Sequence, residues 1–131
     1  MRVGIVYFEN TMNKKLTTIV ENLAEGIKSQ GHQVDIINGN KDINSKLTIY
    51  NYIAIGTESI NFLGGKIPPR VTSYLSNSGI IKGKRSYGFT IRNSLRTQKT
   101  LGKLMSVMEH EGMYLKKSDI ISTQNEAKII G

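Results

Sequence analysis

The sequence contains no cysteine, and this absence removes several kinds of chemistry at once. Disulfide bonds, thiolate metal sites, iron–sulfur clusters and thiol nucleophiles all require cysteine side chains. A long hydrophobic run is also lacking, because the apolar stretch 3–8 is too short to span a membrane. No small-residue cleavage site typical of a secretory signal follows that stretch. We therefore expect a cytoplasmic protein that does not bind membranes.

Acidic residues are scarce, with ten Asp and Glu against eighteen Lys and Arg. The resulting net charge of +8 and pI near 9.8 favour an anionic partner, such as a nucleotide, a nucleic acid or an acidic protein surface. A solvated, lysine-rich surface is the alternative interpretation. With 131 residues, 38% of them hydrophobic, and no repeat, linker or low-complexity segment, the chain is expected to form one domain over residues 1–131.

Hydrophobic periodicity predicts strands that alternate with helices. Residues 3–8 are almost continuously apolar, which is typical of a strand buried on both faces, and 33–37 and 52–56 predict two more strands. Apolar residues between 14 and 30 recur on one helical face, and Gly31 supplies the stop. Further patterns predict helices over 68–78 and 97–111, a turn or two at most over 44–50, and strands over 87–91 and 113–122.

This order of elements predicts an α/β fold, a three-layer αβα sandwich with a doubly wound parallel sheet. Right-handed crossovers and the short first connection favour the strand order 2-1-3-4-5. After the fifth strand only residues 123–131 remain, which are too few for a stable closing helix. We therefore expect apolar side chains of strands three to five to lie near water on the face of the first helix. Such a patch predicts a homodimer or another partner there.

Ligands of open parallel sheets bind beyond the carboxyl ends of the strands, at the switch between strands one and three. Three loops are expected to meet there, over residues 9–14, 57–66 and 92–96. Basic residues gather in and beside these loops, which favours an anion at this edge. They are Lys14, Lys15, Lys66, Arg70, Arg92, Arg96 and Lys99.

The first of these loops resembles the phosphate-binding loop of flavodoxins. It follows a hydrophobic strand and opens a helix, and Thr11 and Asn13 fall on positions that match the hydroxyl-rich family pattern. Residues 56–59, Gly-Thr-Glu-Ser, are similar to the Gly-Ser-Pro-Thr that begins the second flavin loop of the family. Residues 74–75, Tyr-Leu, stand where the family favours Phe-Leu. The resemblance covers nearly the whole chain and implies the flavodoxin fold and FMN.

The loops also depart from the family pattern. Glu9 replaces the first hydroxyl of the phosphate loop, Met12 its glycine and Lys14 its last hydroxyl. Ile60 stands where a flavin-stacking aromatic ring is often found, and Phe62 is the nearest substitute. The third loop lacks the glycines common there. A helix N-terminus still offers N–H groups to a phosphate, and Lys14 adds positive charge, whereas an inward Glu9 would repel it.

Other chemical motifs are weaker. His32 precedes the second strand and His110 falls in the last turn of a helix, where surface roles explain them, and no spacing predicts a metal site. Ser59 and Ser94 have no elbow motif or paired base, which argues against a hydrolase. The basic residues 82–85 lie in a turn at the opposite edge and are interpreted as solvated, so nucleic acid is possible but not favoured.

The resemblance therefore implies a flavodoxin-like protein that binds FMN non-covalently and transfers electrons, without catalytic side chains of its own. The alternative is a flavodoxin-fold module without flavin that binds another anion, a nucleic acid or a protein partner. The candidate cofactor-binding residues are Glu9, Asn10, Thr11, Met12, Asn13, Lys14, Thr57, Glu58, Ser59, Ile60, Phe62, Arg92, Asn93 and Ser94.

Overall fold

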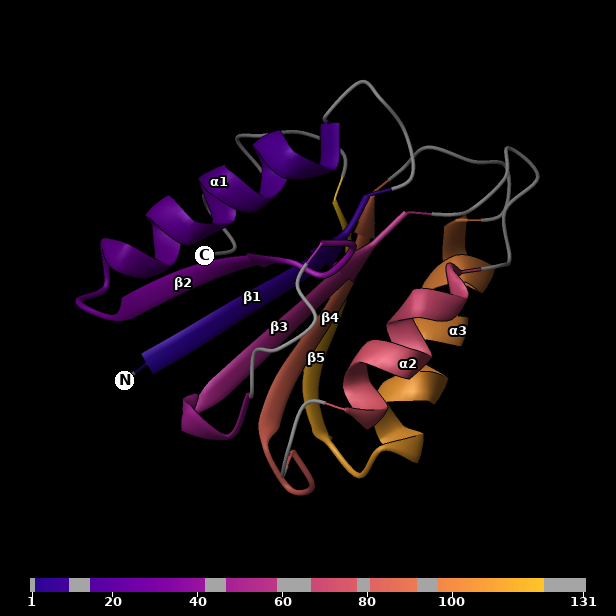
Figure 1. The fold of residues 1–131 in the computed structure, drawn as a ribbon. Helices are drawn as coiled ribbons and strands as arrows, with labels where there is room; N and C mark the ends of the chain where they lie inside the picture. The colour runs from indigo at the N-terminus through magenta and orange to yellow at the C-terminus, as the bar shows by residue number, and fades with distance from the viewer. Residues whose placement is uncertain are drawn as a thin grey trace.

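The computed structural model describes residues 2–9, 15–41, 47–58, 67–77, 81–91 and 97–121. Strands and helices alternate along these residues as the sequence predicts (Figure 1). In chain order the elements are β1 (Arg2–Phe8), α1 (Lys15–Lys28), β2 (Gln33–Asn38), the 3-10 turn η1 (Leu47–Ile49), β3 (Tyr52–Thr57), α2 (Pro69–Ser76), β4 (Arg85–Ile91), α3 (Thr97–His110) and β5 (Tyr114–Ile121).

The strands of the described residues form a five-stranded parallel sheet in the order β2-β1-β3-β4-β5, which confirms the predicted fold class and topology. β1, β3 and β4 lie in the middle of this sheet and are buried along almost their whole length. The edge strands β2 and β5 carry exposed residues. The continuous apolar runs therefore belong to strands covered on both faces.

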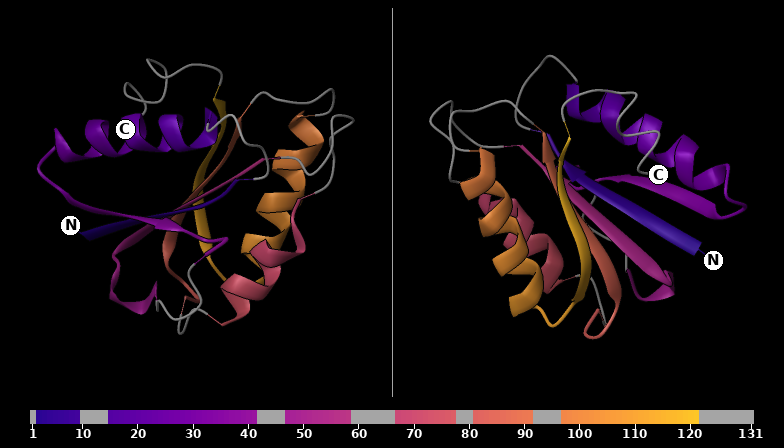
Figure 2. Two further views of the ribbon diagram at one scale, coloured as in Figure 1. Left: turned by 45° about the horizontal axis from the view of Figure 1, so that its top comes forward. Right: turned by 180° about the vertical axis from the view of Figure 1, so that it is seen from behind.

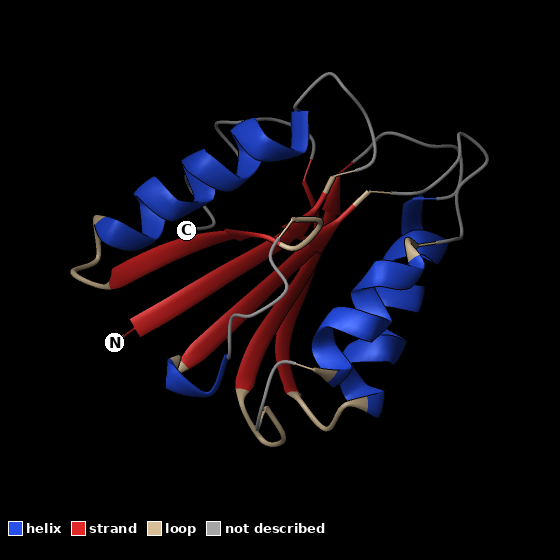
Figure 3. Cartoon of the chain, viewed as in Figure 1, coloured by secondary structure: helices blue, strands red, loops and turns tan. Residues whose placement is uncertain are grey.

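Helices cover the two faces unequally, as Figures 2 and 3 show: α1 lies on one face, and α2 and α3 lie together on the other. Leu16 and Leu23 of α1 are fully buried against Ile5 on one face of β1. On the other face, Leu104 of α3 is buried in the same cluster as Phe8 of β1. Within the described residues, no helix is long and apolar enough to cross a membrane.

Two glycines follow helix ends, and the first of them, Gly31, is the predicted stop. Gly31 follows α1 with φ of 89°, and Gly112 follows α3 with φ of 84°. Side chains with a Cβ rarely adopt this left-handed conformation, so glycine is favoured at both positions. The predicted helix ends are accordingly within two residues of the observed ends of α1, α2 and α3.

Among the described residues, the expectation of exposed apolar side chains on the α1 face of strands three to five holds only at the amino end of β5, where Tyr114 is 59% exposed. Tyr87 is only 6% exposed, and Phe89 is fully buried against Gly56, whose lack of a side chain makes room for the ring. On β5 this face carries Lys117 and Asp119, which form an ion pair, and Asp119 accepts a hydrogen bond from Tyr87 Oη at 3.0 Å. Beyond Tyr114, the apolar side chains of β4 and β5 on this face are therefore buried, and the charged pair Lys117 and Asp119 lies beside them.

Two remaining points of that expectation concern β4 and residues 123–131. Gly88 of β4 lies on the other face, beside Met108 of α3, so it does not reduce the apolar surface on the α1 face. Residues 123–131 are outside the described residues, so the missing closing helix and the homodimer remain predictions.

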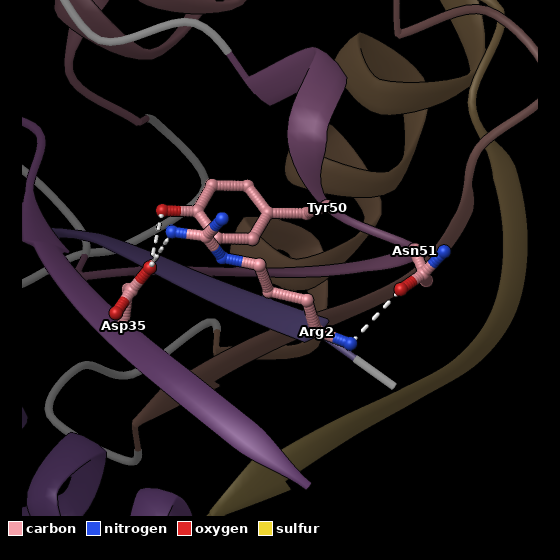
Figure 4. A network of polar contacts seen from close by, with 4 residues as sticks. All are labelled: Arg2, Asp35, Tyr50 and Asn51. Atoms are coloured by element: carbon pink, nitrogen blue, oxygen red, sulfur yellow. Dashed lines mark hydrogen bonds and ion pairs between the residues drawn. The ribbon is translucent and has the colours of Figure 1, made fainter.

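A polar network joins β1, β2 and β3 near the amino ends of the strands (Figure 4). Asp35 Oδ2 accepts hydrogen bonds from Arg2 Nη2 at 3.2 Å and from Tyr50 Oη at 2.9 Å. The Arg2 guanidinium also lies 5.5 Å from the centre of the Tyr50 ring, and its backbone N–H donates to Asn51 Oδ1. The Tyr50 ring packs over Gly4, which fixes the segment before β3 on the sheet.

Candidate functional site

The topology creates a switch point at the carboxyl ends of β1 and β3. These two strands are neighbours, with Phe8 beside Thr57, yet β1 is followed by a helix on one face and β3 by a helix on the other. Crevices at such switch points are the usual ligand sites of open parallel sheets. We call this region, with the end of β4 and the first turns of α1, α2 and α3, the carboxyl edge.

Hydrogen bonds fix the strand ends at the carboxyl edge. The buried Thr90 hydroxyl donates to the carbonyl of Thr57 at 2.7 Å, and the Thr57 hydroxyl donates to the carbonyl of Glu58 at 3.1 Å. The backbone N–H of Glu58 donates to the carbonyl of Phe8 at 3.3 Å. The ends of β1, β3 and β4 therefore form one rigid rim.

All three described helices begin at this edge, and their first turns share a charge pattern. None contains an acidic residue, and each contains a cation: Lys15 in α1, Arg70 in α2 and Lys99 in α3. Acidic side chains normally stabilise helix N-termini, where the backbone dipoles leave partial positive charge. Because these first turns contain no acidic residue, the partial positive charge at the start of each helix adds to the charge of its cation. The Arg70 side chain is held here, because its Nε donates to the carbonyl of Gly39 at 3.0 Å.

Two carboxylates oppose this positive potential. Glu9 is half-buried, and its Oε1 accepts a hydrogen bond at 2.9 Å from the hydroxyl of Thr17, the third residue of α1. Asn40, just after β2, donates from its side chain to the backbone carbonyl of Glu9. Glu58 is 1% exposed. A negative charge from the loop after β1 therefore lies at the first turn of α1.

Of the predicted site residues, the structure describes Glu9, Thr57 and Glu58, and it brings these three together at the carboxyl edge. Of the predicted basic residues, Lys15, Arg70 and Lys99 are described. The other predicted positions lie outside the described residues and remain predictions; they are Asn10, Thr11, Met12, Asn13, Lys14, Ser59, Ile60, Phe62, Lys66, Arg92, Asn93, Ser94 and Arg96.

The sequence analysis missed three residues that shape this edge. Thr17 and Asn40 bind the side chain and the backbone of Glu9, and Thr90 ties β4 to the end of β3. Thr17 carries a usable signal, because a hydroxyl in the first turn of a predicted helix often pairs with a polar group of the preceding loop. Thr90 carries none, since a threonine inside a strand is ordinary.

The two histidines lie away from this edge. His32 is half-buried in the turn before β2, and His110 is the exposed last residue of α3. The position of His110 agrees with the surface role inferred from the sequence, whereas Nδ1 of His32 is buried and has no hydrogen-bond partner among the described residues.

The described groups fit an anion at the carboxyl edge. Helix N-termini and nearby cations bind phosphate groups, and α1 begins directly beyond the switch point. The carboxylates of Glu9 and Glu58 weaken the binding of an anion at the carboxyl edge, but they do not prevent it. A nucleotide cofactor such as FMN is therefore compatible with the described residues.

Comparison with solved structures shows that the fold is flavodoxin-like. Oxidised Flavodoxin 1 from Bacillus cereus superposes with a TM-score of 0.76 at 11% identity, covering 98% of this chain and 90% of that chain. The reduced flavodoxin of Megasphaera elsdenii gives 0.74 at 14% identity, with 98% and 94% coverage. A flavodoxin from the domain Archaea gives 0.73 at 16% identity, with 99% and 93% coverage. No family model and no curated protein sequence matches the chain.

Proposed function

We propose that this protein binds FMN non-covalently at the carboxyl edge and serves as an electron-transfer flavoprotein. One observation carries the proposal: all three helices of the described residues start at this edge, and the first turn of each contains a cation and no acidic residue. The flavodoxin-like fold extends over nearly the whole chain and supports the same interpretation. Because the flavin would supply the redox chemistry, no catalytic side chain is required.

The residues of the chain would bind and orient the cofactor. The first N–H groups of α1 and the Lys15 ammonium are suited to the phosphate, since both place positive charge at one helix end. The rim fixed by Thr57 and Thr90 would give the isoalloxazine ring a rigid boundary. In the second loop, Phe62 is the predicted stacking partner of that ring, and Ile60 is a predicted contact at the position where the family often has an aromatic residue.

A specific observation favours the second candidate, a module of this fold without flavin. The Glu9 carboxylate already interacts with the first turn of α1 through Thr17, at the position suited to a phosphate. A chain with this arrangement would bind a less charged ligand or a protein partner at the same edge.

Titration of the full chain with FMN separates the two candidates. Bound flavin absorbs visible light, and its fluorescence changes when protein surrounds it, so binding is read directly. Parallel titrations use riboflavin, which lacks the phosphate, and inorganic phosphate as a competitor. We expect FMN to bind more tightly than riboflavin and phosphate to compete with FMN. Absence of FMN binding at any accessible protein concentration would refute the proposal and leave the flavin-free candidate.

A pair of lysine variants locates the phosphate. Lys15 begins α1 and Lys28 ends it, so Lys15→Gln and Lys28→Gln remove the same charge from opposite ends of one helix. We expect Lys15→Gln to weaken FMN binding about two- to fivefold, the range for a solvent-exposed ion pair, and to leave riboflavin binding unchanged. Lys14→Glu is expected to weaken FMN binding further. Equal affinities of the Lys15 and Lys28 variants for FMN would move the phosphate away from α1.

A further inference from the structure

The register of the sheet brings two tyrosines and an arginine into one row at the amino ends of β3, β4 and β5. Tyr52 pairs with Arg85, and Arg85 pairs with Tyr114. Residues in register on neighbouring parallel strands lie about 4.8 Å apart and direct their side chains to the same face. Tyr52 packs against the α1-side core, whereas Met113 and Leu115, which flank Tyr114, pack on the α2–α3 side. The row therefore lies on the α1 face.

This row is accessible because α1 does not reach it. α1 packs over β2, β1 and β3, so the amino ends of β4 and β5 extend beyond the helix. Tyr114 is 59% exposed, Arg85 is exposed, and Tyr52 is half-buried with its hydroxyl donating to the carbonyl of Ser86. Burial raises the pKa of the Tyr52 hydroxyl above its ordinary value.

An open, basic basin adjoins the row. It has a volume of about 500 Å³ and is lined by Asn51, Gly83, Lys84 and Arg85. The Lys84 ammonium donates to the carbonyls of Thr48 and Tyr50 at 2.7 Å each, so its charge is held at a fixed place. A lysine has three N–H donors, and such an ammonium can also contact an anion.

The nearby charges leave this corner positive. Lys116 lies over the Tyr114 ring at 5.0 Å from its centre, and Lys82 is exposed in the adjoining turn. The acid Glu111 accepts a hydrogen bond from Ser76 of α2, so it is turned toward the other face. Among the residues that the structure describes, Arg85, Lys82 and Lys116 have no carboxylate partner.

We propose that the Tyr52–Arg85–Tyr114 row and the adjoining basin bind single-stranded nucleic acid, with a phosphate at Arg85 and a base stacked on Tyr114. Exposed aromatic side chains on a sheet face, surrounded by cations, bind unpaired bases by stacking and the backbone by charge. A duplex hides its bases, and an acidic peptide has none to stack. The open basin suits a polymer that passes over it better than a small molecule that must be enclosed. This surface is at the opposite ends of the strands from the carboxyl edge, so flavin binding does not affect the test.

Fluorescence anisotropy with labelled oligonucleotides tests binding by the full chain. The probes are oligothymidylate and oligouridylate of roughly twelve nucleotides, within the usual site sizes of such surfaces. A duplex of the same length and a polyglutamate peptide of the same charge serve as competitors. We expect the single strands to bind, and the two competitors to displace them poorly. Absence of oligonucleotide binding at low salt, or equally effective displacement by polyglutamate or duplex, would overturn the proposal.

Variants of two exposed residues assign the contacts. Tyr114→Ala is expected to weaken binding about fivefold to a hundredfold, the effect of losing one stacked base, while Tyr114→Phe keeps the ring and the affinity. Arg85→Gln should reduce the slope of log K against log salt by about 0.7, the value for one lost phosphate contact on a single strand. The control Lys103→Gln removes an exposed charge from α3 on the other face and should leave both quantities unchanged.

Intrinsic fluorescence gives a second readout of the stacked base, without a labelled oligonucleotide. The chain has six tyrosines and no tryptophan, so its emission comes from tyrosine. A base stacked on Tyr114 should quench part of this emission at saturation, and the quenching should be absent in Tyr114→Phe, which keeps the affinity. Unchanged affinity of Tyr114→Ala, an Arg85→Gln variant that behaves like Lys103→Gln, or saturation without quenching would each contradict the stacked geometry.

Discussion

Replacing Glu9 with glutamine changes the charge at the first turn of α1 while keeping the local hydrogen bond. In the structure Glu9 Oε1 accepts from the Thr17 hydroxyl at 2.9 Å, and a glutamine side-chain oxygen accepts the same bond. The variant therefore removes one negative charge and little else. If the FMN phosphate binds at the start of α1, this variant should bind FMN more tightly than the unaltered chain.

The size of the effect follows from the position of Thr17. As the third residue of α1, it lies within one turn of the helix start, so the carboxylate and a phosphate there would be about 6–7 Å apart. Two unit charges at that separation in water repel each other by about 0.6 kcal/mol. Because a phosphate monoester carries nearly two charges at neutral pH, the total is about 1 kcal/mol, which corresponds to about fivefold tighter binding of FMN.

The same substitution should lower the stability of the cofactor-free protein. A carboxylate at a helix N-terminus stabilises the fold by about 0.3–1 kcal/mol, and glutamine loses this term. Glu9→Gln thus has opposite expected effects on the free energy of unfolding and on FMN affinity. A general loss of folding would weaken both, so the two outcomes are distinguishable.

The measurements are urea unfolding and flavin fluorescence titrations with FMN and riboflavin. Glu109→Gln is the matched control, because it removes an exposed carboxylate near the end of α3, at the opposite edge of the sheet. Riboflavin affinity should be the same in all variants, since the expected repulsion acts on the phosphate. If Glu9→Gln leaves FMN affinity unchanged or lowers it, the phosphate does not bind beside this carboxylate and our reasoning is wrong.

Three further substitutions test contacts that stabilise the fold. Gly4→Ala should destabilise the protein by about 1–3 kcal/mol in urea unfolding, because a Cβ there would lie 2.8 Å from the Tyr50 ring. Gly102→Ala in α3, where no atom lies within 4 Å of the added Cβ, should instead stabilise it, by up to about 1 kcal/mol; equal losses from both substitutions would refute the steric argument. Thr90→Val removes the 2.7 Å hydrogen bond to the Thr57 carbonyl and should lower the free energy of unfolding by about 1–2 kcal/mol, whereas no change would show that this bond contributes nothing.

The fold was predictable because its signals are local. A strand covered on both faces is typically a continuous apolar run, which residues 3–8 and 52–56 supply, and residues 87–91 alternate apolar with small side chains. Gly31 and Gly112 mark helix ends through their own backbone conformation. Once strands alternate with helices, right-handed crossovers restrict the sheet order to a few possibilities, and 2-1-3-4-5 is the observed one. The same order locates the carboxyl edge.

Contacts between distant residues were decided only by the tertiary structure. The pairing of Glu9 with Thr17 depends on how the loop after β1 returns to α1, and the burial of Phe89 depends on Gly56 of a neighbouring strand. No local pattern encodes the contact of Phe89 with Gly56, and the hydroxyl of Thr17 indicates a polar partner without identifying Glu9, because each contact needs two segments brought together in a particular alignment.

The register of β5 against β4 shows most clearly which features the sequence predicts and which only the tertiary structure decides. The sequence identifies residues 113–122 as a strand, but not which of them lies beside each residue of β4. A bulge at Ser86/Tyr87 shifts the register by one residue, so that Lys117 lies beside Tyr87 while Tyr114 stays beside Arg85. One extra residue reverses the face of every side chain that follows it. The sequence by itself therefore determined the elements and their order, whereas the side chains that meet across the strands were decided by the pairing of the whole sheet.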